Sequence, residues 1–147
     1  MKILIQRVHR AKVTVADRTT GEIGRGLLLF VGFGKDDDAT KLRPLAQKIC
    51  NMRLFQDAAH EKKFHLSLLD ISGELLVVSQ FTLYADTTKG RRPEFFGALE
   101  PAKANEFYQE FMRHLSECGA KKVAAGEFGA EMNVALENDG PVTLLVE

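Results

Sequence analysis

The sequence predicts an α+β domain: a mainly antiparallel, barrel-like β-sheet with two main amphipathic helices packed outside it. Three observations favour this class. Most apolar residues lie in short alternating or continuous runs, which are typical of strands. Several runs are joined by hairpin-length turns, and only two stretches repeat apolar residues at helical spacing. The 147 residues show no internal repeat or linker, so we expect a single domain over residues 1–147.

The first third of the chain predicts strands and then a helix. Residues 2–15 are extended up to a turn at Asp17–Gly21. The continuous apolar run "GLLLFVGF" (Gly26–Phe33) is typical of a strand buried on both faces. After the polar stretch "GKDDDAT", apolar residues share one face from about Thr40 to Asn51, with Pro44 near the first turn, where a missing N–H costs little.

The middle of the chain predicts short strands around one strong strand. "RLF" (53–55) is a short strand, "DAAHEKK" (57–63) a loop, and "DISGE" (70–74) a turn after the alternating Phe64, Leu66 and Leu68. "ELLVVSQFTLYA" (Glu74–Ala85) is the strongest strand pattern, and the irregular loop "DTTKGRRPEFFG" follows it.

The last third predicts the second helix and a hairpin. The helix begins at Pro101, a favourable first residue, and ends at Gly119. Met132, Val134 and Leu136 then alternate, "NDG" signals a hairpin, and Val142–Val146 form the last strand.

Composition narrows the class of partner. Twenty basic and 20 acidic residues cancel, so a broad basic surface for long duplex DNA is not expected and no DNA partner is predicted. There is no signal-peptide pattern and no apolar run of membrane-spanning length, so we expect no membrane partner. Cys50 and Cys118 lie in helical patterns without the neighbours of a zinc site, so we expect reduced thiols, a cytoplasmic protein and no metal.

The first candidate for chemistry is "SQFTLYA", because Ser79, Gln80 and Thr82 interrupt an apolar strand. They are either ordinary strand residues with local partners, or a group of donors that holds the oxyanion of an acyl-transfer reaction. A hydroxyl nucleophile normally needs a base. The four histidines (His9, His60, His65 and His114) lie in no nucleophile-elbow motif, so we expect them to be structural or solvated.

The second candidate is the loop "KGRRPEF" with Lys89, Arg91 and Arg92. On composition it is a solvated charged loop. Its alternative role is to bind phosphate, since arginine pairs with phosphate oxygens in a fork.

The third candidate is Gly140-Pro141. It is either part of a hairpin before the last strand, or a cis peptide that serves a purpose of its own. With no Cβ at Gly140, another molecule can approach this backbone closely.

The stretches "SQFTLYAD", "KGRRP", "FGAEM" and "NDGPVT", in this order, resemble the D-aminoacyl-tRNA deacylases, also called D-tyrosyl-tRNA deacylases. "IQRV" and "GLLLFVG" fit as well, so the resemblance covers essentially the whole chain. It implies a homodimer of β-rich subunits without a cofactor. It also implies hydrolysis of the ester between a D-amino acid and the 3′-terminal adenosine of tRNA, with clearance of glycyl-tRNA as a further activity.

The resemblance also implies roles for individual residues. Ser79, Gln80, Phe81 and Thr82 form the catalytic wall, and Gly140-Pro141, inserted from the other subunit, rejects an L side chain by steric exclusion. Arg7 braces the Gly-Pro turn, and Phe128 and Met132 lie near the terminal adenosine. The family is thought to use the 2′-hydroxyl of the terminal ribose, and Thr82 is the alternative nucleophile; since no residue visibly activates Thr82, the sequence favours the 2′-hydroxyl.

One stretch departs from the family pattern. "HEKKFHL" (60–66) stands where a Gly-Lys-Met-Asn-like run is expected, which puts the shape of that loop in doubt. The competing functional hypothesis is a non-catalytic nucleic-acid-binding module that uses "KGRRP" and Lys121-Lys122. Zero net charge and the absence of an aromatic-basic strand motif weigh against it.

Overall fold

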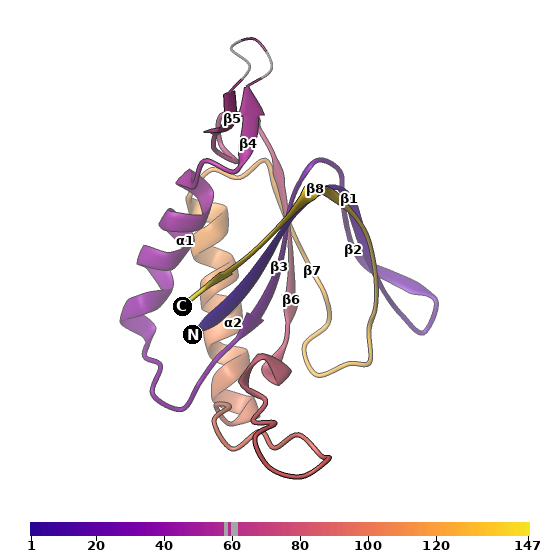
Figure 1. The fold of residues 1–147 in the computed structure, drawn as a ribbon, viewed down its shortest axis with the longest axis vertical. Helices are drawn as coiled ribbons and strands as arrows, with labels where there is room; N and C mark the ends of the chain where they lie inside the picture. Colours follow the sequence, from indigo (N-terminus) through magenta and orange to yellow (C-terminus); the bar gives the residue numbers. More distant parts are fainter. Residues whose placement is uncertain (58, 60–61) are drawn as a thin grey trace.

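The fold of the chain was analysed in a computed structural model that describes residues 1–57, 59 and 62–147 (Figure 1). The two main helices are α1 (Leu42–Asn51) and α2 (Pro101–Glu117), and two short 3₁₀ turns, η1 (Ala39–Lys41) and η3 (Phe81–Tyr84), lie between strands and helices. The strands are β1 (Lys2–Val15), β2 (Arg18–Ile23), β3 (Gly26–Gly32), β4 (Phe55–Asp57), β5 (Lys62–Leu66), β6 (Glu74–Ser79), β7 (Lys122–Ala125) and β8 (Asn133–Val146).

The main sheet is mixed, which corrects the expectation of a mainly antiparallel one. Its order is β2-β1-β3-β6-β7, and β8 pairs with β1. The pairs around β1 are antiparallel, but β3–β6 and β6–β7 are parallel. The reason is that α1 lies in the connection from β3 to β6 and α2 in the connection from β6 to β7, and crossover connections of this kind join parallel strands.

The sheet curls into a nearly closed barrel. β2 approaches β7 so closely that a Cβ on Gly21 would lie 2.5 Å from the carbonyl oxygen of Ala125. Lys122 Nζ closes the same seam by donating to the carbonyl oxygen of Glu22 (2.6 Å). The absence of a side chain at Gly21 therefore lets the two edges meet.

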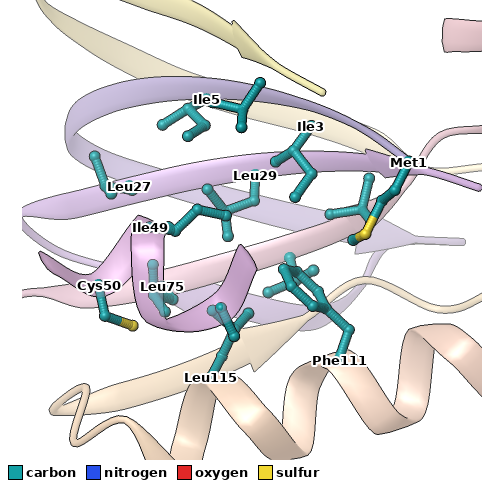
Figure 2. Packing of buried hydrophobic residues seen from close by; sticks show 14 of the residues in the cluster. Met1, Ile3, Ile5, Leu27, Leu29, Ile49, Cys50, Leu75, Phe111 and Leu115 are labelled. Carbon is teal, nitrogen blue, oxygen red and sulfur yellow. The ribbon is translucent and has the colours of Figure 1, made fainter. Parts of the chain in front are cut away.

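Two apolar clusters fill the two faces of the sheet. The larger cluster lies between the sheet and the helices, which run side by side on one face (Figures 1 and 2). Figure 2 shows Ile3 and Ile5 of β1 and Leu27 and Leu29 of β3 on the sheet side of this cluster, and Ile49, Phe111 and Leu115 on the helix side. The smaller cluster lies inside the curled sheet and contains Val8, Ala11, Val13, Ile23, Leu28, Leu76 and Val78.

The two helices confirm the periodicity argument. Asp38 caps η1 through Thr40, and α1 follows directly to Asn51. α2 begins at Pro101 behind the Glu100 cap, and Gly119 follows its end with φ +94°, a conformation that favours glycine. Neither helix in the described part of the chain has the length and hydrophobicity needed to span a membrane.

Three predicted strands or turns are corrected. The turn predicted at Asp17–Gly21 is a tight one at Ala16–Asp17, where both φ angles are positive, so β2 already begins at Arg18. The strong strand pattern from Glu74 ends at Ser79 and continues as η3. "NDG" makes no hairpin, because β8 pairs with β1 on both sides of it.

The segment around residue 60 differs from its prediction as well. The short strand is β4, which begins at Phe55, and β5 begins at Lys62, so part of the predicted loop is strand. The rest of that loop, residues 58, 60 and 61, lies outside the described residues. Phe64, one of the residues that depart from the family pattern, has φ +53° and is 53% exposed.

Candidate active site

The end of β6 shapes the first wall of the site. Directly after β6, the Gln80 N–H donates to the carbonyl oxygen of Val31 in β3 (2.8 Å). Gln80 then leaves the strand conformation (φ −146°, ψ 79°) and the chain turns into η3. Gly32 makes room for this turn, since a Cβ there would lie 2.8 Å from the Gln80 carbonyl oxygen.

A cavity of about 620 Å³ opens beside this turn. Ser79, Gln80 and Phe81 line one side, and Phe128 and Met132, from the segment before β8, line another. Five of the residues expected at the site therefore come together. Its size is ordinary for a small-molecule site, and its walls are mainly apolar with a few polar groups.

Sequence reasoning missed much of the apolar wall. Phe33, Phe95, Leu99 and Ala104 line the cavity, and the Phe95 ring packs edge-on against Phe81 at a centroid distance of 5.0 Å. Ala104 lies within the predicted second helix, where an apolar residue is expected to face the core. The two adjacent aromatic residues in "EFF" (94–96), inside a charged loop, were the sequence signal that could have placed Phe95 at the site.

Thr82 lies at the rim of the site. It does not line the cavity, and its hydroxyl accepts a hydrogen bond from Gln80 Nε2 (2.5 Å). Among the described histidines, His9 lies 3.6 Å from Asp139, and His114 contacts Glu110 and Glu117 on α2. His60 lies outside the described residues. No contact between Thr82 and a histidine is seen in the described part of the chain.

The basic loop leaves directly from η3. Asp86 and Glu94 pair through two backbone hydrogen bonds (2.7 and 2.9 Å) and close it. Lys89, Arg91 and Arg92 are exposed between these two residues, and Phe95, a wall of the cavity, follows at once. The three basic side chains therefore lie on a closed loop beside the cavity, although they do not line it.

Gly140 and Pro141 form a bulge in β8. Gln6 of β1 faces Thr143 and Val8 faces Asn138, so the residues from 139 to 142 oppose Arg7 alone. The Gly140–Pro141 peptide is cis, both residues are exposed, and Gly140 has φ +119°. Within the described chain, this bulge does not line the cavity of its own subunit.

Arg7 lies against the inner side of the bulge. Its Nε lies 2.9 Å from Asp139 Oδ2 without hydrogen-bond geometry, and its Nη1 donates to the Leu54 carbonyl oxygen (2.5 Å). A Cβ on Gly140 would lie 2.9 Å from Arg7 Nη2. The position fits the predicted brace, and the functional role of Arg7 stays a prediction.

Two further expectations concern thiols and metals. Both cysteines are free, as predicted, and burial, with a smaller effect of Cys118, raises the pKa of the Cys50 thiol to about 12. Within residues 1–57, 59 and 62–147, no group of three or more His, Cys, Asp or Glu side chains could hold a metal ion.

Comparison with known proteins decides the family. A sequence model of the family described as "D-Tyr-tRNA(Tyr) deacylase" matches residues 4–147. This chain belongs to that family. The D-aminoacyl-tRNA deacylase of Thermosipho africanus (strain TCF52B) is 51% identical over 147 residues, which cover 100% of this chain and 97% of the relative. The D-aminoacyl-tRNA deacylase of Roseiflexus castenholzii (strain DSM 13941 / HLO8) is 52% identical, covering 100% and 92%.

Solved structures share the fold of this family member. A structure titled "c-Myc DNA Unwinding Element Binding Protein" matches with a TM-score of 0.93 and 38% identity over 100% of this chain and 98% of the other. A probable eukaryotic D-amino acid tRNA deacylase matches with a TM-score of 0.85 over 99% and 97% of the two chains; at 18% identity this likeness concerns the fold alone.

Proposed function

We propose that the cavity beside η3 is where this D-aminoacyl-tRNA deacylase holds the aminoacylated 3′ end of its tRNA in the cytoplasm. As a member of the family, the chain is a hydrolase that cleaves the ester bond of D-aminoacyl-tRNA and releases a free D-amino acid and tRNA. The observation that carries the location is the convergence of Ser79–Phe81 with Phe128 and Met132 on one cavity. Phe128 and Met132 supply an apolar and aromatic surface for the terminal adenine, since bases stack on such side chains.

The scissile carbonyl lies, in this proposal, at the start of η3. N–H groups at the beginning of a helical turn have no carbonyl within the turn to bond. The first such bond here runs from the Leu83 N–H to the Gln80 oxygen (3.3 Å), so the N–H groups of Phe81 and Thr82 precede it. They are the donors that we assign to the developing oxyanion.

Water is the nucleophile, and the 2′-hydroxyl of the terminal ribose assists it. Water adds to the ester carbonyl carbon, the bond to the ribose 3′-oxygen breaks, and that oxygen takes up a proton. The assignment rests on Thr82, whose hydroxyl accepts from Gln80 and has no contact to a described histidine that could activate it. Positioning and oxyanion stabilisation then supply most of the acceleration.

A second copy of the chain completes the site. The Gly140–Pro141 bulge is exposed and lies away from its own cavity, so it is free to enter the cavity of a partner. Main-chain carbonyls of the partner subunit's Gly140 and Pro141 would then occupy the space that an L side chain needs, while a D side chain points away. Glycyl-tRNA has no side chain to exclude and is also cleaved.

An apolar row on the sheet supports this homodimer. Leu145 of β8 pairs with Leu4 of β1, Leu4 pairs with Phe30 of β3, and Phe30 pairs with Val78 of β6. Leu145 is 56% exposed, and Val78 lines the cavity. The row therefore leads from the exposed Leu145, over the half-buried Leu4 and Phe30, to the buried Val78 at the site. An apolar row that reaches the surface in this way suits a contact with a second subunit.

Subunit mixing tests the two-chain site. Ala130→Trp fills the cavity and Gly140→Val disables the bulge, because its Cβ would press on Arg7. Each variant alone should be inactive on D-tyrosyl-tRNA. After joint unfolding and refolding in equal amounts, half of the dimers are mixed and each has one intact site, so about one quarter of the wild-type activity should return. Recovery of no activity in mixtures shown to contain mixed dimers would contradict the proposal.

A further inference from the structure

Asp37 is a buried carboxylate that the proposed chemistry does not use. Its side chain is 5% exposed and receives donors from four places in the chain. Oδ2 accepts from the Gly34 N–H (2.7 Å) and from the Tyr84 hydroxyl (3.1 Å). Oδ1 contacts the amino group of Met1 and lies 3.4 Å from Lys41 Nζ.

One of these donors, Tyr84, lies on the turn whose first residue, Phe81, lines the cavity. Tyr84 is the last residue of that turn, η3. Its ring lies against Gly34, where a Cβ would come within 2.6 Å of it, and Lys2 Nζ lies 5.1 Å from the ring centroid. The far end of the turn is thus held in two ways. The Tyr84 ring packs between Gly34 and Lys2, and the Tyr84 hydroxyl donates to the Asp37 carboxylate.

The hydrogen bond from Gly34 ties Asp37 to a second group of residues that line the cavity. Gly34 follows β3 and pairs with Ala98, and the Leu99 N–H donates to the Phe33 carbonyl oxygen (2.9 Å). Phe33, Ala98 and Leu99 line the cavity. Through Gly34 and Tyr84, one carboxylate therefore links two backbone segments that both contribute residues to the lining of the cavity.

The charge of Asp37 fixes the direction of these bonds. Burial opposes ionisation of Asp37, but hydrogen bonds from the Met1 amino group and Gly34 outweigh it, and its pKa lies below its ordinary value. Burial and the neighbouring Asp37 raise the pKa of Tyr84, so Tyr84 keeps its proton and donates it. Hydrogen bonds to a charged group are stronger than those between neutral groups, which suits a contact that fixes a position.

We propose that Asp37 is a positioning residue for the reaction, acting through the Tyr84 hydroxyl to hold η3 at the distance from β3 that the transition state needs. The inference rests on the proposed location of the site. A displaced turn still binds tRNA through the loop and the apolar walls, but it presents the Phe81 and Thr82 N–H groups wrongly. The rate constant at saturating enzyme should therefore fall by a larger factor than the enzyme concentration for half-saturation rises.

The test measures single-turnover cleavage of D-tyrosyl-tRNA against enzyme concentration, together with the melting temperature. Tyr84→Phe and Asp37→Asn should each lower the saturating rate constant by about 10-fold or more, with half-saturation within about 3-fold of wild type. The double variant should be little slower than either single variant, because both remove one interaction.

Two matched controls separate positioning from stability. Asp36→Asn removes an exposed neighbouring carboxylate. Tyr108→Phe removes a buried tyrosine hydroxyl that donates to the Val77 carbonyl oxygen (2.7 Å) and does not touch η3. Both controls should keep the saturating rate constant within about 2-fold of wild type, whatever they do to the melting temperature.

The inference is wrong if Tyr84→Phe lowers the melting temperature like Tyr108→Phe but cleaves at the wild-type rate. This result for Tyr84→Phe is decisive even if Asp37→Asn does not fold. Normal cleavage by Ala130→Trp would instead contradict the site itself, and the inference with it. An inactive Ala130→Trp beside a normal Tyr84→Phe would overturn the inference alone.

Discussion

The proposal that Thr82 is not the nucleophile rests on the partners of its hydroxyl. Its hydroxyl accepts from Gln80, and the described His9 and His114 pair with carboxylates elsewhere. A threonine hydroxyl without a base is a weak nucleophile. We therefore expect Thr82 to matter more for the shape of η3 than for making the new bond.

If water and the 2′-hydroxyl do the chemistry as proposed, Thr82→Ala should retain substantial activity, within about 10-fold of the wild-type single-turnover rate. Cleavage of D-tyrosyl-tRNA under single-turnover conditions measures this directly. Complete loss of cleavage, with normal folding and tRNA binding, would identify Thr82 as the nucleophile.

Asp37 should also make stability depend on pH. Its pKa in the folded chain lies below the ordinary 3.8, so its contribution is present above about pH 4 and is lost as the pH falls through the folded pKa. Asp37→Asn should lower the free energy of unfolding by about 1–3 kcal/mol at pH 7. The difference from wild type in urea unfolding should shrink at pH 3; an equal difference at both values would contradict the assignment.

Among the elements, the helices and most strands followed from periodicity, whereas the C-terminal end of β6 and the course of β8 did not. Local alternation continues through Leu83, but Gln80 bonds to β3 directly after β6, and Gly32 and Gly34 leave space for a turn. These causes lie in β3 and the residues that follow it, so they cannot be read from the sequence of Glu74–Ala85 alone. The hairpin signal "NDG" was likewise overridden by pairing with β1 on both sides.

The site was predictable to different degrees. Ser79–Thr82 stood out as an interruption of a strand pattern, and Gly140-Pro141 as a hairpin residue pair or a cis peptide before the last strand. The roles of both came from the family resemblance. Phe33 and Ala104 looked like core residues because an apolar wall and an apolar core have the same pattern. Asp37 could not be distinguished from Asp36 and Asp38 in the sequence, since only the fold shields the side chain of Asp37 from solvent.

The loop from Asp86 to Glu94 should contribute affinity and little to the chemical step. Replacing Lys89, Arg91 and Arg92 with alanine should raise the half-saturating tRNA concentration and leave the saturating rate constant near wild type. The slope of log affinity against log salt should fall by about 2–3 if each cation meets one phosphate. Arg43→Ala with Lys48→Ala on α1 is the control, and an unchanged slope in the loop variant would rule out phosphate binding by this loop.

At the scale of the whole molecule, one chain contains the cavity and the bulge but does not bring them together. Leu145→Glu should leave the fold intact, because the side chain is 56% exposed, yet it places a charge in the proposed contact surface. We expect a folded monomer by sedimentation, with cleavage reduced at least about 10-fold. The exposed Lys48→Glu on α1 is the control. A monomeric variant with full activity would contradict the two-chain site.

The most direct test of the central claim is the release of amino acid from D-tyrosyl-tRNA and L-tyrosyl-tRNA, side by side, by wild type and by Gly140→Ala. We expect rapid release from the D substrate and almost none from the L substrate by wild type. Gly140→Ala should change the rate or the selectivity, because the added Cβ would press on Arg7 and displace the bulge. Equal release of both by wild type, or unchanged selectivity and rate in a folded Gly140→Ala, would contradict exclusion by the Gly140–Pro141 backbone.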